Sequence, residues 1–106
     1  MSWKHNPVGV YIMSCYAYEV LSDSFITDAE FDACGWHIAE EWDNLTHRHR
    51  DYINREACAF TSALTVPYEE LPLIALSATH HKLGTRLEDS PIYNKIMEQL
   101  EFRQFI

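Results

Sequence analysis

The feature that most constrains the fold is a predicted helix that is apolar on nearly every side. It follows Asn6-Pro7, a typical helix start, because an asparagine can cap the first turn and proline suits the first helical position. Apolar residues occupy two faces of the segment from Val8 to Leu21, namely Val8, Tyr11, Ile12 and Cys15 on one and Val10, Met13, Ala17 and Val20 on the other. Such a helix must be covered all round. We therefore expect it to lie inside the core or against a partner.

A second helix is predicted to begin at the capping box Thr27-Asp28-Ala29-Glu30, with Thr27 as the cap and Glu30 reaching back to it. Its apolar stripe consists of Phe31, Cys34, Ile38, Trp42 and Leu45. We expect this helix to end at His47-Arg48-His49-Arg50, because cations are favourable at the C-terminal end of a helix.

Three further segments are predicted to be helical. One runs from Arg55 to Leu64, with Ala57, Cys58, Phe60 and Leu64 facing inward. The next opens at Pro72 and closes at Gly84, a typical C-cap residue, although Ile74 and Leu76 alone would also fit a strand. The last starts at Ser90-Pro91 and is lined by Ile92, Ile96, Leu100 and Phe105.

Together these segments predict a mostly α-helical fold of the all-α class. The chain has 106 residues, of which 47% are hydrophobic, so one packed core is feasible. We expect a compact single domain of four to five helices over residues 1–106. A helical hairpin is expected within residues 1–50, and additional helices within residues 51–106 complete the core.

Net charge limits the partners that this protein could bind, and cysteine usage indicates its redox compartment. Sixteen acidic and eight basic residues give a net charge of -8, which argues against nucleic-acid binding and suits either a basic partner surface or simple solubility. Cys15, Cys34 and Cys58 form no CxxC pair and lie among apolar residues, so we expect buried free thiols in a reducing compartment. The sequence has no signal-peptide pattern and no apolar run of membrane-spanning length. We expect a cytoplasmic protein that makes no membrane contact.

One edge of the second predicted helix could form a recess. Asp28 and Asp32 are four residues apart and therefore share a side, beside Phe31. Gly35 and Ala39 are expected along the same edge, and the preceding helix would add Tyr16 or Tyr18. Such a recess suits a flat ring or a cation. The alternative interpretation is that Asp28 serves the helix dipole, Asp32 is solvated and Phe31 belongs to the core.

The stretch YAYEVLSDSFITDAEFD, residues 16–32, resembles the N-terminal Ia domain of NAD-dependent DNA ligases. That family has a Tyr-x-Tyr-His sequence, a short Asp-Pro turn, and Ile-x-Asp-Ala-Glu-Tyr-Asp opening a second helix. The residues in register are Tyr16, Tyr18, Val20, Ile26, Asp28, Ala29, Glu30 and Asp32. The resemblance covers residues 1–45. The chain length and the segment WDNLTHRHRDYI, residues 42–53, resemble most the short ligase-related phage proteins of unknown function.

In these ligases the Ia domain holds the nicotinamide mononucleotide half of NAD, stacking its ring between aromatics and contacting it with carboxylates. The resemblance therefore implies NAD or nicotinamide mononucleotide as possible ligands. The residues that it implies as contacts are Tyr18, Glu19, Asp28, Phe31 and Asp32. Glu19 stands where the family has histidine, which reverses the charge, and Phe31 stands where it has tyrosine.

Catalytic motifs are missing from the sequence. The Lys-x-Asp-Gly motif of the ligase family does not occur, so we expect that the chain is not a ligase on its own. There is also no GxSxG, GxGxxG or GxxxxGK motif. The pairs His47-x-His49 and His80-His81 could supply metal ligands, but neither has a CxxC or HExxH motif as a partner at metal-binding spacing. We expect the first pair to provide charge at a helix C-terminus and the second to occupy surface or cap positions.

These observations leave two main functional hypotheses. The first is a non-catalytic phage-type accessory protein that uses a ligase Ia-like module to bind a host protein of DNA metabolism or antiviral defence, or that forms a homo-oligomer. The second is a nicotinamide nucleotide binding module that acts as a sensor, a sequestering protein or the partner of a separate adenylation subunit. A third is an enzyme that uses the histidines.

Overall fold

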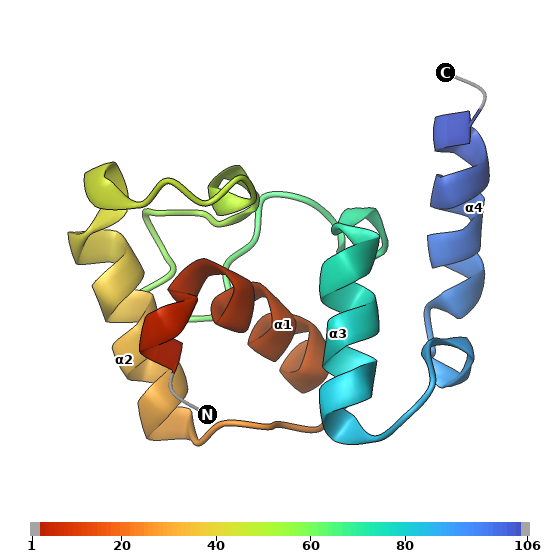
Figure 1. Ribbon diagram of the computed structural model, residues 1–106, viewed down its shortest axis with the longest axis horizontal. Helices are drawn as coiled ribbons and strands as arrows, with labels where there is room; N and C mark the ends of the chain where they lie inside the picture. The colour runs from red at the N-terminus through yellow and green to blue at the C-terminus, as the bar shows by residue number, and fades with distance from the viewer. Residues whose placement is uncertain (1–2, 105–106) are drawn as a thin grey trace.

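The computed structural model describes residues 3–104, in which four α-helices are joined by loops and short 3-10 turns (Figure 1). The helices are α1 (Pro7–Glu19), α2 (Asp28–Glu40), α3 (Leu73–Leu83) and α4 (Tyr93–Gln104). Within residues 3–104, the only β-type pairing is an isolated antiparallel bridge between Ile53 and Leu64. The prediction of an all-α fold with four to five helices is confirmed.

Helix α1 lies at the centre of the molecule, between α2 and α3 (Figure 1). It begins as predicted, because the Asn6 side chain accepts a hydrogen bond of 3.1 Å from the Gly9 amide and Pro7 takes the first position. Its buried residues are Val8, Val10, Tyr11, Ile12, Met13, Ser14, Cys15, Tyr16 and Ala17. We expected this helix either inside the core or against a partner, and the structure places it inside the core, enclosed by the rest of the chain.

Helix α2 begins at the predicted capping box. The Thr27 hydroxyl accepts a hydrogen bond of 3.1 Å from the Glu30 amide, and the Glu30 carboxylate accepts one of 2.9 Å from the Thr27 amide. The hydrogen bond from the Thr27 amide to the carboxylate is the main cause that lowers the pKa of Glu30. Cys34 and Ile38 are fully buried, so the predicted inner face is correct over this part of the helix.

The predicted end of α2 is wrong, because the helix stops at Glu40. The guanidinium of Arg50 donates hydrogen bonds of 3.0 and 3.1 Å to the carbonyl oxygens of Trp42 and Leu45, and it lies 5.0 Å from the Trp42 ring centroid. These contacts hold the chain in a loop after α2. His47 and His49 therefore lie in that loop. The prediction that they provide charge at a helix C-terminus is wrong.

The predicted helix from Arg55 to Leu64 is also wrong. This segment is a series of turns that we call the 55–64 loop, and the Ile53–Leu64 bridge closes its base. Cys58 is buried as expected, whereas Phe60 is 75% exposed and not inward-facing. The physical reason is a pair of long-range hydrogen bonds. The Tyr11 hydroxyl donates to the Thr61 carbonyl at 2.7 Å and accepts from the Ala63 amide at 2.9 Å. These bonds replace helical ones.

The second half of the chain closes the core with α3 and α4, which run in opposite directions (Figure 1). Gly84 ends α3 in the left-handed conformation with φ of 70°, as predicted, and the strand alternative for Ile74 and Leu76 is excluded. Helix α4 begins at Tyr93 rather than at Pro91 and buries Ile96. Phe105, predicted to line this helix, lies outside the described residues.

A buried polar cluster joins α1, α3 and the start of the last segment. The Tyr16 hydroxyl lies 2.7 Å from both His80 Nε2 and Ser90 Oγ, and His80 Nδ1 lies 2.8 Å from Thr85 Oγ1. The prediction that His80 lies at the surface or in a cap is therefore wrong, since only 3% of it is exposed. His81 is exposed.

None of the helices within residues 3–104 has the length and apolarity needed to cross a membrane.

Candidate functional site

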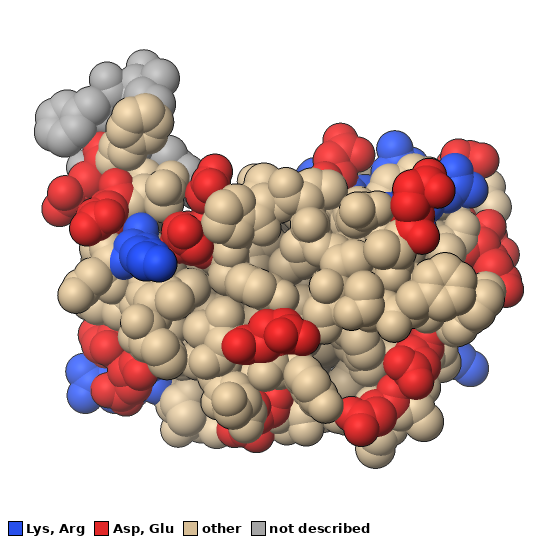
Figure 2. Space-filling model, turned by 180° about the vertical axis from the view of Figure 1, so that it is seen from behind, with Lys and Arg blue, Asp and Glu red and all other residues tan. Residues whose placement is uncertain are grey.

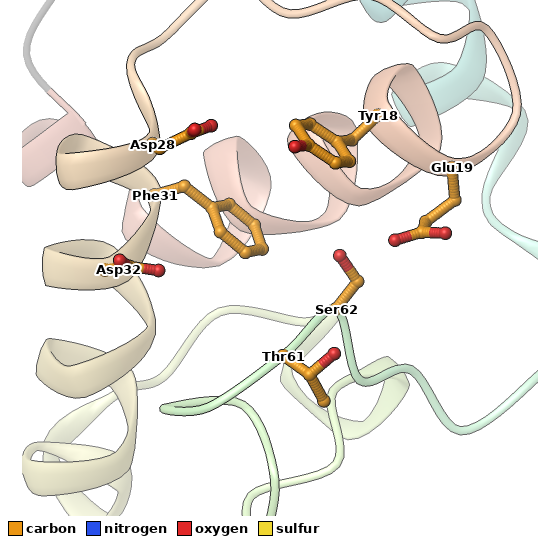
Figure 3. A pocket seen from close by; sticks show the side chains of 7 residues that line it. All are labelled: Tyr18, Glu19, Asp28, Phe31, Asp32, Thr61 and Ser62. Atoms are coloured by element: carbon orange, nitrogen blue, oxygen red, sulfur yellow. The ribbon is translucent and has the colours of Figure 1, made fainter.

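An open recess of about 300 Å³ lies where the end of α1, the start of α2 and the 55–64 loop meet (Figure 3). Its lining residues are Tyr18, Glu19, Asp28, Phe31, Asp32, Thr61 and Ser62. All five of the contact residues implied by the ligase resemblance are therefore brought together. The volume is at the lower end of the range of about 300–1,000 Å³ that is usual for small-molecule sites.

Helix α2 supplies one wall of the recess. Asp28 and Asp32 are separated by one helical turn and project from the same side, with Phe31 between them (Figure 3). The Phe31 ring points into the recess (Figure 3), and it is stacked on the buried Tyr11 ring, with centroids 5.1 Å apart and an angle of 12° between the planes. The α2 wall thus consists of one aromatic ring between two carboxylates.

A second wall comes from the 55–64 loop, which the Tyr11 hydroxyl holds in place. Burial, with smaller effects of Cys15 and Cys58, raises the pKa of Tyr11 far above its ordinary value. The hydroxyl therefore stays protonated and can donate to the Thr61 carbonyl at any physiological pH. Tyr11 supports both walls, because its ring contacts Phe31 and its hydroxyl fixes the loop that presents Ser62.

Several details of the predicted recess are different in the structure. Tyr18 lines it, whereas Tyr16 is buried in the hydrogen-bonded cluster with His80. Gly35 and Ala39 are not among the lining residues, and Gly35 is buried against the backbone at Cys58. Thr61 and Ser62 were missed, because their segment was predicted to be a helix. No local signal in the sequence places these two hydroxyls here.

The recess is electronegative. Glu19, Asp28 and Asp32 line it together with no lysine or arginine, and no ion pair within the described part of the chain reaches them. Acidic side chains also dominate the charged groups on the face shown in Figure 2. Two aromatic faces beside three carboxylates can stack a flat ring, accept hydrogen bonds from amides and attract a cation. The same charges repel phosphate.

The histidines within residues 3–104 do not gather into a metal-binding site. His47 and His49 are neighbours with ring centroids 5.2 Å apart, and His47 Nδ1 accepts a hydrogen bond from the His49 amide. His80 uses both ring nitrogens in the buried cluster. Among residues 3–104, no group of three or more His, Cys, Asp or Glu side chains could hold a metal ion.

Comparisons with protein-family models, curated proteins and solved structures found no match to this chain. Its fold and its recess define it as a small all-α domain with an open aromatic and carboxylate-lined recess.

Proposed function

We propose that this protein is a non-catalytic binding module whose recess holds a flat ring of the nicotinamide type, with nicotinamide mononucleotide or NAD as candidate ligands. One observation carries the proposal: two helices and a loop bring the five predicted contact residues into a single recess. These residues are Tyr18, Glu19, Asp28, Phe31 and Asp32. The module resembles a ligase Ia domain, and it would act as a sensor, a sequestering protein or the partner of a separate adenylation subunit.

The chemistry of the ligand suits the recess. An oxidised nicotinamide ring is a flat aromatic cation that carries a carboxamide. The rings of Tyr18 and Phe31 offer aromatic faces, and a cation over such a face gains about 0.5–2 kcal/mol, depending on how far it is desolvated. Asp28 and Asp32 can accept the carboxamide N–H groups as charge-assisted hydrogen bonds.

The phosphate is the part of a nucleotide that fits least well. No basic side chain lines the recess, and Glu19 adds a negative charge at its α1 side. We therefore expect nicotinamide riboside, which keeps the cationic ring and lacks the phosphate, to bind more tightly than the mononucleotide. The difference should shrink at high salt, because salt screens the repulsion.

Calorimetric titration tests this function. We expect saturable binding of the riboside, weakened about tenfold by Asp28→Asn or Asp32→Asn, which corresponds to about 1.4 kcal/mol for one charge-assisted hydrogen bond. Asp43→Asn is the matched control, because Asp43 is exposed and lies outside the recess. No saturable binding of riboside, mononucleotide or NAD up to millimolar concentration, a bound of about 4 kcal/mol, would refute the proposal.

A second candidate function is that of a phage-type accessory protein in the bacterial cytoplasm that binds a host protein of DNA metabolism or antiviral defence, or a second copy of itself. Helix α1 does not support this function, because the chain itself covers its apolar faces and leaves none for a partner. An exposed aromatic pair does support it. Trp36 and Phe60 contact each other edge to face, with ring centroids 5.4 Å apart, and both side chains are exposed. Affinity capture from a bacterial lysate tests it, and recovery of no stoichiometric partner together with a monomeric mass would contradict it.

A further inference from the structure

The exposed side of α2 carries a regular row of side chains. Asp28, Asp32, Trp36 and Glu40 follow one another at every fourth position, so they lie along one stripe of the helix. All four are exposed, including 49% of Trp36. Phe60, from the 55–64 loop, packs against Trp36 with an angle of 76° between the ring planes. We call Asp32, Trp36, Glu40 and Phe60 the α2 surface.

The aromatic pair is unusual among the exposed apolar residues of this protein. Within residues 3–104, the other large ones are Tyr18, Ile74 and Phe102, on α1, α3 and α4 respectively. Trp36 and Phe60 come from different elements and form one apolar patch with a polar rim. Patches of this kind mark interaction sites, and tryptophan is enriched among the residues that contribute most to binding energy.

The charges beside the pair define the partner. Asp32 and Glu40 flank Trp36 by one helical turn on each side, and no ion pair within residues 3–104 reaches either carboxylate. At a rise of 1.5 Å per residue they are separated by about 12 Å along the helix. Four residues of an extended chain span about 13 Å. Two basic residues at that spacing would therefore meet both carboxylates.

We propose that the α2 surface binds an extended, arginine-bearing segment of a partner protein. One arginine pairs with Asp32, a second pairs with Glu40, and the side chain midway between them packs on Trp36 and Phe60. Arginine fits better than lysine, because its planar guanidinium pairs with a carboxylate through two hydrogen bonds and also stacks on aromatic rings.

This inference rests on the second proposed function, partner binding, and does not require that the recess holds a ligand. Trp36, Glu40 and Phe60 do not line the recess, whereas Asp32 belongs to both surfaces. The decisive variants are therefore Trp36→Ala, Phe60→Ala and Glu40→Lys, which leave the recess residues unchanged.

The test uses a synthetic nonapeptide with arginine at its second and sixth positions and leucine at its fourth, so that all three side chains share one face of an extended chain. We expect saturable binding in an NMR titration, with amide and indole shifts confined to α2 and the 55–64 loop. Each of the three variants should weaken binding about tenfold or more. A lysine version of the peptide should bind several-fold more weakly, and a glutamate version should not bind.

Matched controls separate this surface from general attraction to an acidic protein. Ile74→Ala removes another exposed apolar side chain, and Glu98→Lys reverses an exposed charge on α4. Both should leave the affinity within about twofold. Circular dichroism verifies that each variant is folded. If a variant is unfolded, the location of the binding surface is decided by the peptide-induced NMR shifts of the unmodified protein instead.

Three results would overturn the proposal. The first is peptide binding that resists Trp36→Ala and Phe60→Ala, and the second is shifts that map to another face. The third is capture of a host protein from a lysate that both aromatic variants retain, which would leave partner binding intact but move it away from α2. Failure to capture any partner and a monomeric mass would instead refute the second proposed function itself.

Discussion

At Gly35, α2 comes so close to the 55–64 loop that no side chain fits between them. A Cβ atom at this position would overlap the carbonyl oxygen of Cys58, which is backbone and cannot move aside as a flexible side chain could. The loop that presents Thr61 and Ser62 to the recess is therefore seated directly on α2.

Gly35→Ala should destabilise the protein. Alanine in a helix interior is ordinarily favoured over glycine by about 1 kcal/mol, but overpacking at a buried contact costs about 1–3 kcal/mol. We expect the overlap to prevail and the melting temperature to fall. Ala33→Gly, at an exposed position of the same helix, should lower stability by only the propensity difference of about 1 kcal/mol. A higher melting temperature for Gly35→Ala would show that the loop can withdraw without cost.

At the scale of elements, the buried cluster of Tyr16, His80, Ser90 and Thr85 ties α1 to α3 and to the chain before α4. Tyr16 donates to Ser90, so the neutral His80 ring donates from Nε2 and accepts at Nδ1. Burial lowers the pKa of His80, opposed by the nearby Asp89 and Glu88. The fold therefore favours the uncharged ring.

This shift predicts how stability depends on pH. The ordinary histidine pKa is 6.5, so below this pH the unfolded chain binds more protons at this residue than the folded protein does. The contribution of His80 is complete above pH 6.5 and decreases as the pH falls from there toward the lowered folded-state pKa. The pKa of His49 is lowered as well, mainly by burial, and acts in the same direction.

Urea unfolding at several pH values between about 7.5 and 5.5 measures this dependence. We expect the free energy of unfolding to decrease toward the acidic end, and His80→Gln to lower stability at neutral pH and flatten the decrease. His81→Gln, at the exposed neighbour, should retain the slope of the unmodified protein. An unchanged slope in His80→Gln would contradict the assignment.

The element boundaries also show what the sequence could and could not predict. The starts of α1 and α2 and the end of α3 depend on residues within one turn, namely Asn6, Thr27 with Glu30, and Gly84, and local chemistry predicted all of them. The end of α2 depends on Arg50, which reaches the Trp42 carbonyl from the following loop. Such contacts leave no periodic pattern in the sequence.

The recess also has a part that the sequence could predict and a part that it could not. Asp28, Phe31 and Asp32 lie together because helical spacing brings them to one side of α2, which the sequence predicted. Thr61 and Ser62 line the same recess because Tyr11, about fifty positions earlier in the chain, bonds to their loop. His80 was likewise missed, because its partner Tyr16 is 64 positions away. Long-range hydrogen bonds of single side chains override local propensity at these points.

At the scale of the whole molecule, the three cysteines are buried, as the sequence predicted. Burial raises the pKa of Cys15 and of Cys34 to about 12, and it also raises the pKa of Cys58. Because the thiolate is the reactive form, folded protein should be almost inert toward thiol reagents near neutral pH.

Labelling with a chromogenic disulfide reagent measures this inertness. We expect no rapid reaction in native buffer and three equivalents in concentrated urea, with the native rate limited by opening of the fold. Gly35→Ala should accelerate labelling of Cys58 in particular, since Cys58 Sγ lies 3.5 Å from the Gly35 carbonyl oxygen. Rapid reaction of one equivalent in native buffer would mean that one thiol is accessible.

The central place of α1 has a consequence for synthesis on the ribosome. Helix α1, the most apolar helix within residues 3–104, is made before α3, which covers one of its sides and is completed only at Leu83. At roughly 5–20 residues per second, several seconds pass between the two. During that interval α1 presents its apolar surface to the cell. The nascent chain should therefore be a chaperone client, and products cut short before α3 should aggregate instead of folding.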